Sequence, residues 1–190
     1  LMNSTSIEDD EERKILRARA NKMIQNNFTN MVRMSFTNLF GEQSRTIFKE
    51  EIQLALNEAL QTPLQGYIAG QEGMRIRPNR NHVLVENNFK KLIVVGEKDP
   101  VLNSENALEE AKKTNSEIVV LNGGHMSHIE NKEELIIAYQ KYSTKLIDDL
   151  RKTYLDPKYL KARQQEIQEE QTISERYFRI EKKEKIALIF

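Results

Sequence analysis

Two stretches of sequence decide the fold: KKLIVVGEKDPVLN at residues 90–103 and SEIVVLNGGHMSHIE at residues 116–130. Each contains a short apolar run that ends in a polar turn with glycine, a pattern typical of a buried β-strand followed by a loop. Asp99 and His125 lie just past the ends of the two predicted strands. Catalytic side chains of α/β folds occupy that position, at the carboxyl ends of the strands. We therefore expect an acid and a histidine at one edge of a sheet.

The segment between the two runs predicts how the strands are connected. Asn103 or Ser104 is a suitable N-cap for a helix that crosses from one strand to the next. The predicted elements of this half are strands at residues 91–95 and 117–121 and helices at residues 104–113 and 133–150. A strand, a helix and a strand in this order form a βαβ unit with parallel neighbouring strands. The last helix carries apolar positions that can pack back on the sheet.

The first 78 residues are predicted to be a helical region, since they are rich in strong helix formers and have no proline before Pro63. Helices are expected at residues 9–27, 28–39, 44–60 and 64–74, the first with Ser6, Asp9 or Asp10 as its cap. Residues 83–85 are predicted as an extended segment before the first strand. The expected organisation is a helical region at 1–78 and an α/β core at 79–150.

Residues 151–190 differ in character and are predicted to belong to another unit. Asp156 and Pro157 break the chain, residues 158–171 form an intensely charged predicted helix, and residues 173–190 are strand-like. The chain begins with Leu1 rather than Met and shows no signal pattern, so we expect that Leu1 is not the natural start.

Composition limits the class of partner. The 29 basic residues balance the 29 acidic ones, so no net field attracts nucleic acid or acidic lipid, and the basic cluster RIRPNR at residues 75–80 lacks interleaved aromatics. No apolar run approaches the roughly 18 residues of a membrane span. The absence of cysteine excludes disulfides and thiolate metal sites and fits a reducing compartment. We predict a cytoplasmic protein that binds no nucleic acid.

Asp99 and His125 favour ordinary explanations when each is taken alone. Asp99 precedes Pro100 and can be a turn or capping residue, and His125 follows two glycines and can be a hydrogen-bonded loop histidine. Together they follow two parallel strands in the order acid, then base, which is the chain order of an α/β-hydrolase site. In such a site the acid orients the imidazole and the histidine acts as general base and then general acid. We predict these roles for the pair.

The other candidates carry less chemistry. His128 is predicted to be a supporting or surface residue, and His82 a structural or solvent-facing one. A metal site of His125, His128 and Glu130 lacks a fourth ligand and a recognised spacing, so no metal is predicted, and no cofactor motif is present.

A serine nucleophile of this class normally sits in G-x-S-x-G, because its strained turn leaves no room for larger neighbours. Among the seven glycines, only Gly66 and Gly70 have the required separation, and Ile68 stands between them. The sequence therefore holds the acid and base of a predicted site without such a nucleophile turn.

LIVVGEKDPVLN followed by EIVVLNGGHMSHIENKEEL resembles the last two strands and the final helix of α/β-hydrolase fold proteins of the esterase and lipase-like type. The helical stretch at residues 9–73 resembles the cap of such proteins, and LMNST at the start is similar to the end of the strand before the cap. ISERYFRIEKKEKIALIF resembles the opening strands of another hydrolase. The resemblance implies a partial α/β-hydrolase fold with a helical cap and a short, mostly parallel sheet.

The same resemblance implies a Ser-His-Asp acyl hydrolase for small ester or related substrates, with Asp99 and His125 as acid and base. Met31, Met34 and Tyr67 are expected to line an apolar acyl pocket, with plain helix packing as the alternative. Because the nucleophile turn is absent, the isolated chain is predicted to be inactive, with a partner chain or oligomer supplying missing strands. The alternative is a non-catalytic interaction module that docks on a partner chain.

Overall fold

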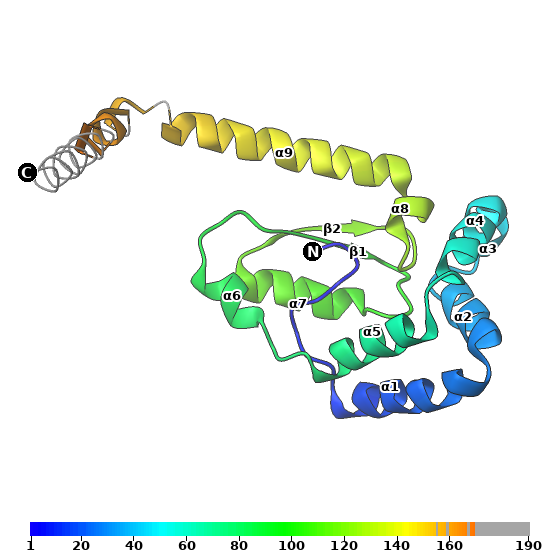
Figure 1. Cartoon of the computed structure of the whole chain (residues 1–190). Helices are drawn as coiled ribbons and strands as arrows, with labels where there is room; N and C mark the ends of the chain where they lie inside the picture. Colours follow the sequence, from blue (N-terminus) through cyan, green and yellow to red (C-terminus); the bar gives the residue numbers. More distant parts are fainter. Residues whose placement is uncertain (155, 159, 167, 170–190) are drawn as a thin grey trace, which may run out of the picture. The chain divides into compact units, whose positions relative to one another are not determined.

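The computed structural model describes residues 1–154, 156–158, 160–166 and 168–169. The chain forms two compact units, Leu1–Gln140 and Lys141–Phe190. Figure 1 shows the sheet and most of the helices in the first unit. The predicted division of this unit into a cap and a core stays a prediction.

The sheet has two strands, β1 (Leu92–Gly96) and β2 (Glu117–Leu121), and they are parallel. The register pairs Leu92 with Glu117 and Gly96 with Leu121. The predicted parallel pair is thus confirmed, with β1 shifted by one residue. Both strands end at the same edge, so the loops that follow them lie close together.

The first three residues extend the sheet beside β1. Met2 forms a parallel bridge with Val94, and the backbone of Leu1 and Asn3 bonds to Val94 on both sides, with N to O distances of 2.8 and 2.9 Å. A third chain segment therefore ends at the same edge of the sheet.

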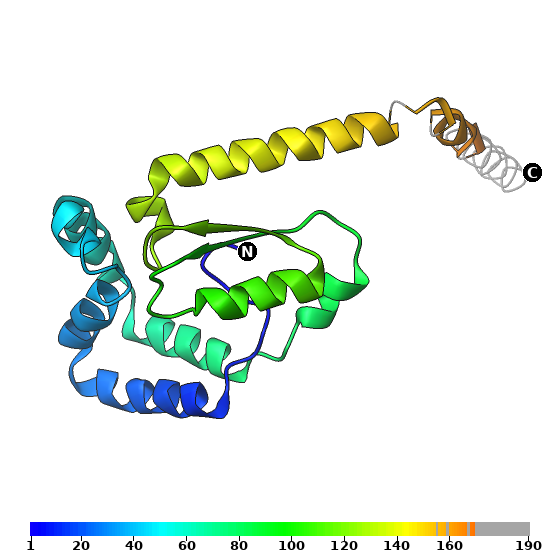
Figure 2. The same cartoon turned by 180° about the vertical axis from the view of Figure 1, so that it is seen from behind.

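Helix α7 (Ser104–Thr114) crosses between the strands and packs along them, as Figures 1 and 2 show. The side chain of Asn103 caps its start by accepting hydrogen bonds from two amides of the first turn. Asn115 ends it in the left-handed conformation, with φ 50°, which asparagine tolerates better than most residues. Strand β1 is the buried centre of this unit: the exposed fraction of Ile93, Val94 and Val95 is at most 2% each.

The helical region has its own apolar cluster of Ile24, Val32 and Leu56. Its helices are α1 (Glu11–Met23), the short 3-10 helix η1 (Ile24–Asn26), α2 (Phe28–Thr37), α3 (Ser44–Ile47), α4 (Lys49–Ala59) and α5 (Leu64–Ile76). Asp10 caps α1, one of the three predicted candidates. The single helix predicted at residues 44–60 is wrong, because the backbone of Phe48 leaves helical geometry and separates α3 from α4.

The extended segment predicted at residues 83–85 is also wrong, since these residues lie in helix α6 (Asn81–Glu86). An apolar run of three residues is too short to show a strand period, and local polar contacts decide the outcome. The Asn79 side chain accepts from the Asn81 amide at 2.9 Å, and the Asn87 side chain donates to the carbonyl of Val83 at 2.7 Å.

After β2 come the short helix α8 (Ser127–Glu130) and the long helix α9 (Lys132–Tyr154), predicted at residues 133–150. Leu135 packs on Val94 and Leu121 of the sheet, whereas Ile136 and Ile137 are 46% and 63% exposed. Of the predicted charged helix, the described residues between 157 and 169 are helical, while the predicted strand at 173–190 lies outside the described residues. None of the described helices is both long and apolar enough to cross a bilayer.

Candidate active site

The loops after β1 and β2 are tied together at the edge of the sheet. The amide of Glu97 donates to the carbonyl of Leu121 at 2.7 Å, and the amide of Lys98 donates to the carbonyl of Gly123 at 2.9 Å. These two bonds continue the parallel pairing beyond the strands. They bring Asp99 of the first loop to His125 of the second.

The carboxylate of Asp99 is fully buried and surrounded by donors. Its Oδ1 accepts from the amides of Val101 and Leu102 at 2.7 and 2.9 Å. Its Oδ2 lies 2.8 Å from Nδ1 of His125, and the exposed fraction of the two side chains is 0% and 22%. The acid is therefore fixed by backbone, and the histidine is accessible from solvent.

Burial raises the pKa of Asp99, but the hydrogen bonds from His125, Leu102 and Val101 together outweigh it and hold the pKa below its ordinary value of 3.8. At neutral pH the carboxylate is ionised and can only accept hydrogen bonds. Nδ1 of His125 must then be the donor. In a neutral ring this leaves Nε2 without a proton, which is the form that a general base requires.

The backbone of His125 is held from the helical region. Its amide donates to the carbonyl of Leu39 at 2.8 Å, and the preceding amide of Gly124 donates to the carboxylate of Glu130. Leu39 lies in the turn between α2 and α3. The histidine therefore depends on a segment far away in sequence for its position.

Glycine is required here for close backbone approach. A Cβ on Gly96 would lie 2.1 Å from the carbonyl oxygen of Gly124, and a Cβ on Gly124 would lie 2.7 Å from the amide nitrogen of Gly41. The alternative reason, positive φ, does not apply, because no glycine of the described chain has it. The glycines before His125 let three backbone segments meet.

We expect Gly124→Ala to lower the free energy of unfolding by about 1–3 kcal/mol, because the added Cβ meets backbone that cannot move aside. Gly70→Ala is the matched control: it lies inside α5 with nothing within 4 Å of its Cβ, and should raise the free energy of unfolding by about 0.5–1 kcal/mol. Urea denaturation of both variants measures the difference. Equal effects at the two positions would contradict the close approach.

Asn3 also lies at this site, and it was not among the residues predicted from the sequence. It has a φ of 42°, and its side-chain Nδ2 lies 3.4 Å from Oδ2 of Asp99 and 3.4 Å from the carbonyl oxygen of Gly124. Asparagine is among the few non-glycine residues that adopt this backbone conformation readily. A polar residue at the end of a third parallel segment was the signal that could have identified it.

No protein-family model matches the sequence, and no curated protein matches it. A thermophilic esterase from Thermogutta terrifontis is similar in structure, with a TM-score of 0.69 and 23% identity over 76% of this chain and 54% of its own. The enol-lactonase from Burkholderia xenovorans LB400 has a TM-score of 0.67 and 15% identity, covering 76% of this chain and 55% of its own.

An α/β-hydrolase enzyme from a Medee basin deep-sea metagenome library is also similar, with a TM-score of 0.60 and 17% identity over 70% of this chain and 51% of its own. The chain has a partial α/β-hydrolase fold. It spans about half the length of the structures it matches. These likenesses concern the fold alone.

The three residues predicted to line an acyl pocket lie in the helical region. Met31 and Tyr67 pack against the cluster of Ile24, Val32 and Leu56, and Met34 is 58% exposed. Tyr67 also contacts Phe28 edge to face and accepts from Gln71 at 3.3 Å. The contacts of Met31 and Tyr67 are those of helix packing, and a role of the three residues in substrate binding stays a prediction.

The remaining histidines lie apart from Asp99 and His125. His82 is an exposed residue of α6, and His128 is exposed on α8, where it borders a cavity of about 590 Å³ together with Phe48 and Glu51. Among the described residues, no three His, Asp or Glu side chains are grouped as a metal ion would need.

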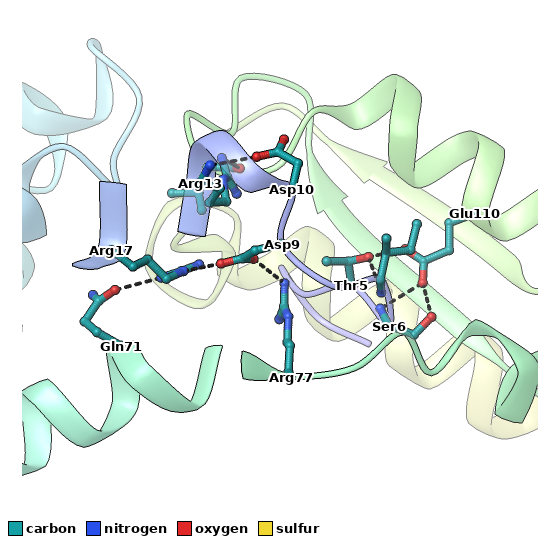
Figure 3. Close-up of polar contacts among 11 residues, drawn as sticks. Thr5, Ser6, Asp9, Asp10, Arg13, Arg17, Gln71, Arg77 and Glu110 are labelled. Carbon is teal, nitrogen blue, oxygen red and sulfur yellow. Dashed lines mark hydrogen bonds and ion pairs between the residues drawn. The ribbon is translucent and has the colours of Figure 1, made fainter. Parts of the chain in front are cut away.

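Asp9 is a second buried carboxylate, and its partners come from α1 and from the residue that follows α5 (Figure 3). It forms ion pairs with Arg17 and Arg77, the latter at 3.0 Å, and only 1% of its side chain is exposed. Nearby, Arg13 donates to the carbonyl of Val101 at 2.7 Å, within the loop that carries Asp99. A cavity of about 290 Å³ lies between these residues and α7. Helix α1 thus contacts the loop after β1, which carries Asp99, directly.

Glu110 of α7 anchors the segment between the first residues and α1. It accepts hydrogen bonds from the hydroxyls of Thr5 and Ser6 at 2.6 and 2.5 Å and from the amide of Ser6 at 2.9 Å (Figure 3). Only 3% of Glu110 is exposed, so these bonds satisfy a carboxylate that would otherwise be costly to bury.

Proposed function

We propose that this chain carries the acid and the base of a Ser-His-Asp acyl hydrolase. The observation that carries the proposal is the 2.8 Å contact between His125 Nδ1 and the buried, ionised Asp99 at the edge where parallel strands end. Ligand and catalytic groups of open α/β sheets gather at this edge. The order acid, then histidine is also that of α/β-hydrolases.

In the proposed reaction, Nε2 of His125 removes the proton from a hydroxyl nucleophile as the oxygen attacks the acyl carbonyl. The same nitrogen then protonates the leaving oxygen, and water repeats the sequence to release the acid. Asp99 orients the ring through Nδ1 and stabilises the imidazolium that forms in between. In this proposal the amides of Val101 and Leu102 continue to donate to Asp99 Oδ1 during these steps.

We propose that residues outside these 190 supply the nucleophile, in the same polypeptide or in a partner chain, because the sequence has no G-x-S-x-G turn. In this proposal residues 1–78 are the cap, residues 79–150 are the acid and histidine strands with the final helix, and residues 151–190 belong to a further unit. The isolated chain is then inactive. The proposed location is the cytoplasm, supported by the absence of cysteine.

The proposed substrate is a small ester or lactone. An esterase and an enol-lactonase are among the structures of the same fold, and both names concern acyl–oxygen bonds. We propose that the helical region closes the acyl pocket through Met31, Met34 and Tyr67. Met34 is 58% exposed, and Met31 and Tyr67 are partly buried, so the side chain of each remains in part accessible to an acyl chain.

A fluorophosphonate probe, which labels activated serine nucleophiles, tests the proposal. We expect no labelling of the 190-residue chain, and labelling of the protein made from its own gene and recovered with an antibody to this chain. His125→Ala should abolish this labelling, whereas His82→Ala, a matched change at an exposed histidine, should preserve it. Labelling that survives His125→Ala would falsify the assignment of the base.

A non-catalytic interaction module is the second candidate, favoured by apolar residues without cover in the described chain. Val120 of β2 is 41% exposed and Ile137 of α9 is 63% exposed. A partner chain that adds to the sheet would cover such residues. This candidate predicts co-purification with a partner and no fluorophosphonate labelling in either protein, which separates it from the hydrolase.

A further inference from the structure

Glu130 is a buried carboxylate whose partners are backbone amides. It is the last residue of α8 and is 8% exposed. Its Oε2 accepts from the amide of Gly124 at 2.5 Å, and its Oε1 accepts from the same amide at 3.1 Å and from the amide of Gly41 at 3.0 Å. The side chain thus joins two loops that are distant in sequence.

The two amides belong to two loops, the turn at residues 39–41 and the loop that carries His125. Gly41 follows Phe40, which is 1% exposed and packs on the ring of Phe36 at a centroid distance of 5.6 Å. Gly124 immediately precedes His125, whose own amide donates to Leu39 in the same turn. The turn at residues 39–41 is therefore fixed by a buried aromatic ring and holds the histidine loop from one side.

The peptide group between Gly124 and His125 is held at every polar atom. The carbonyl oxygen of Gly124 lies 3.4 Å from Asn3 Nδ2, and the amide of His125 donates to the carbonyl of Leu39. The amide of Gly124, just before this peptide group, donates to Glu130. Only one of these three contacts comes from a carboxyl side chain. Removing it would leave a buried amide without a partner, which costs about 1–3 kcal/mol and is relieved by moving the loop.

We infer that Glu130 is a positioning residue for His125, acting through the Gly124 amide, and that it couples the turn at residues 39–41 to the acid–base pair. The inference rests on the proposed function for its catalytic meaning. Its physical basis is distance: the ring nitrogen must stay 2.8 Å from Asp99, and displacements of about 1 Å in such pairs cost about 100-fold in rate. A histidine loop free to shift by that amount loses the contact.

Nuclear magnetic resonance of the 190-residue chain tests this without any need for activity. In nitrogen-15-labelled protein, the Nδ1 proton of His125 bonded to Asp99 should give a resonance downfield of the amides, and Asp99→Asn should remove it. We expect Glu130→Ala to abolish this resonance. Glu130→Gln keeps the acceptor at Oε1 and loses the one at Oε2, so the resonance should persist at a shifted position. In Glu130→Gln the amide signals of Gly124 and Gly41 should both move.

The control is Glu133→Ala, which removes an exposed carboxylate three residues further on and should leave the resonance unchanged. All spectra are taken under conditions in which circular dichroism shows the variant to be folded. If Glu130 had only a structural role, its replacement would lower the melting temperature but leave the His125 signal of the folded protein unmoved. If Glu130→Ala does not fold, the Glu130→Gln spectrum decides.

An unmoved His125 signal in the folded Glu130 variants overturns the inference while the proposed function stands. If the wild-type chain shows no such resonance, the acid–base pair itself fails, and the positioning role with it. The shifts of the Gly124 and Gly41 amides show independently whether the carboxylate bridge exists. The two failures are thus distinguishable.

Discussion

Asp99→Asn is expected to slow fluorophosphonate labelling of the nucleophile-containing protein by about 10⁴-fold, with the fold retained. The amide oxygen of asparagine can still accept from Val101 and Leu102 in place of Oδ1. The amide nitrogen then faces His125 Nδ1 and donates to it, which places the ring proton on Nε2. A ring in that tautomer cannot accept the nucleophile's proton.

Asp10→Asn is the matched control for this prediction. Asp10 is an exposed aspartate that caps α1 by accepting from the Arg13 amide, and asparagine is an equally good cap. It removes the same charge from the same unit without touching the histidine. Labelling rates should equal the unmodified protein's within about twofold; a comparable loss in both variants would mean that net charge, and not the ring tautomer, controls the reaction.

The sheet and the contact between Asp99 and His125 were predictable because they depend on short sequence patterns. The apolar runs before Gly96 and Asn122 each form the predicted strand, and the crossover between them admits a parallel pair. The prediction that both strands are buried holds for β1, whereas in β2 only Leu121 is buried. Once two parallel strands are adjacent, their carboxyl ends meet, and Asp99 and His125 come together without further information. The N-cap at Asn103 was equally local.

The supporting contacts were not predictable because they join residues far apart in sequence. Asn3 reaches Asp99 across 96 positions, and Glu130 reaches Gly41 across 89. The spacing of apolar residues within a short stretch of sequence carries no information about such contacts. The break at Phe48 depends on the backbone conformation of one residue, and the helix at Asn81–Glu86 on hydrogen bonds between asparagine side chains and the backbone; such local contacts override a weak pattern.

Helical spacing also could not separate pocket-lining residues from core residues. Met31 and Tyr67 recur on the apolar faces of their helices, and that spacing is the same for a residue that packs on a neighbouring helix and one that faces a ligand. In the structure both contact the cluster around Ile24. An amphipathic pattern identifies a buried face without identifying its neighbour.

Asp9→Ala is expected to lower the free energy of unfolding by about 3 kcal/mol at pH 7. Breaking a buried ion pair by removing one partner costs about 3–5 kcal/mol, and the lower end applies because Arg77 is 28% exposed. The loss leaves Arg17, whose side chain is 14% exposed, without its carboxylate partner. Glu11→Ala, which removes the exposed pair with Lys14, should change the free energy by less than about 0.5 kcal/mol.

The contribution of Asp9 should also depend on pH, which Asp9→Asn isolates. Burial raises the pKa of Asp9, but the hydrogen bond and charge of Arg17, with Arg77 and Arg13, outweigh it and lower the pKa below 3.8. A group whose pKa is lowered on folding stabilises the folded state above its unfolded pKa, and that stability is lost as the pH falls through the folded pKa. The stability gap between the wild type and Asp9→Asn, measured by urea unfolding, should therefore be constant from pH 7 to about pH 5 and narrow below it. A gap that stays constant to pH 3 would show that Asp9 is held by its packing and not by its charge.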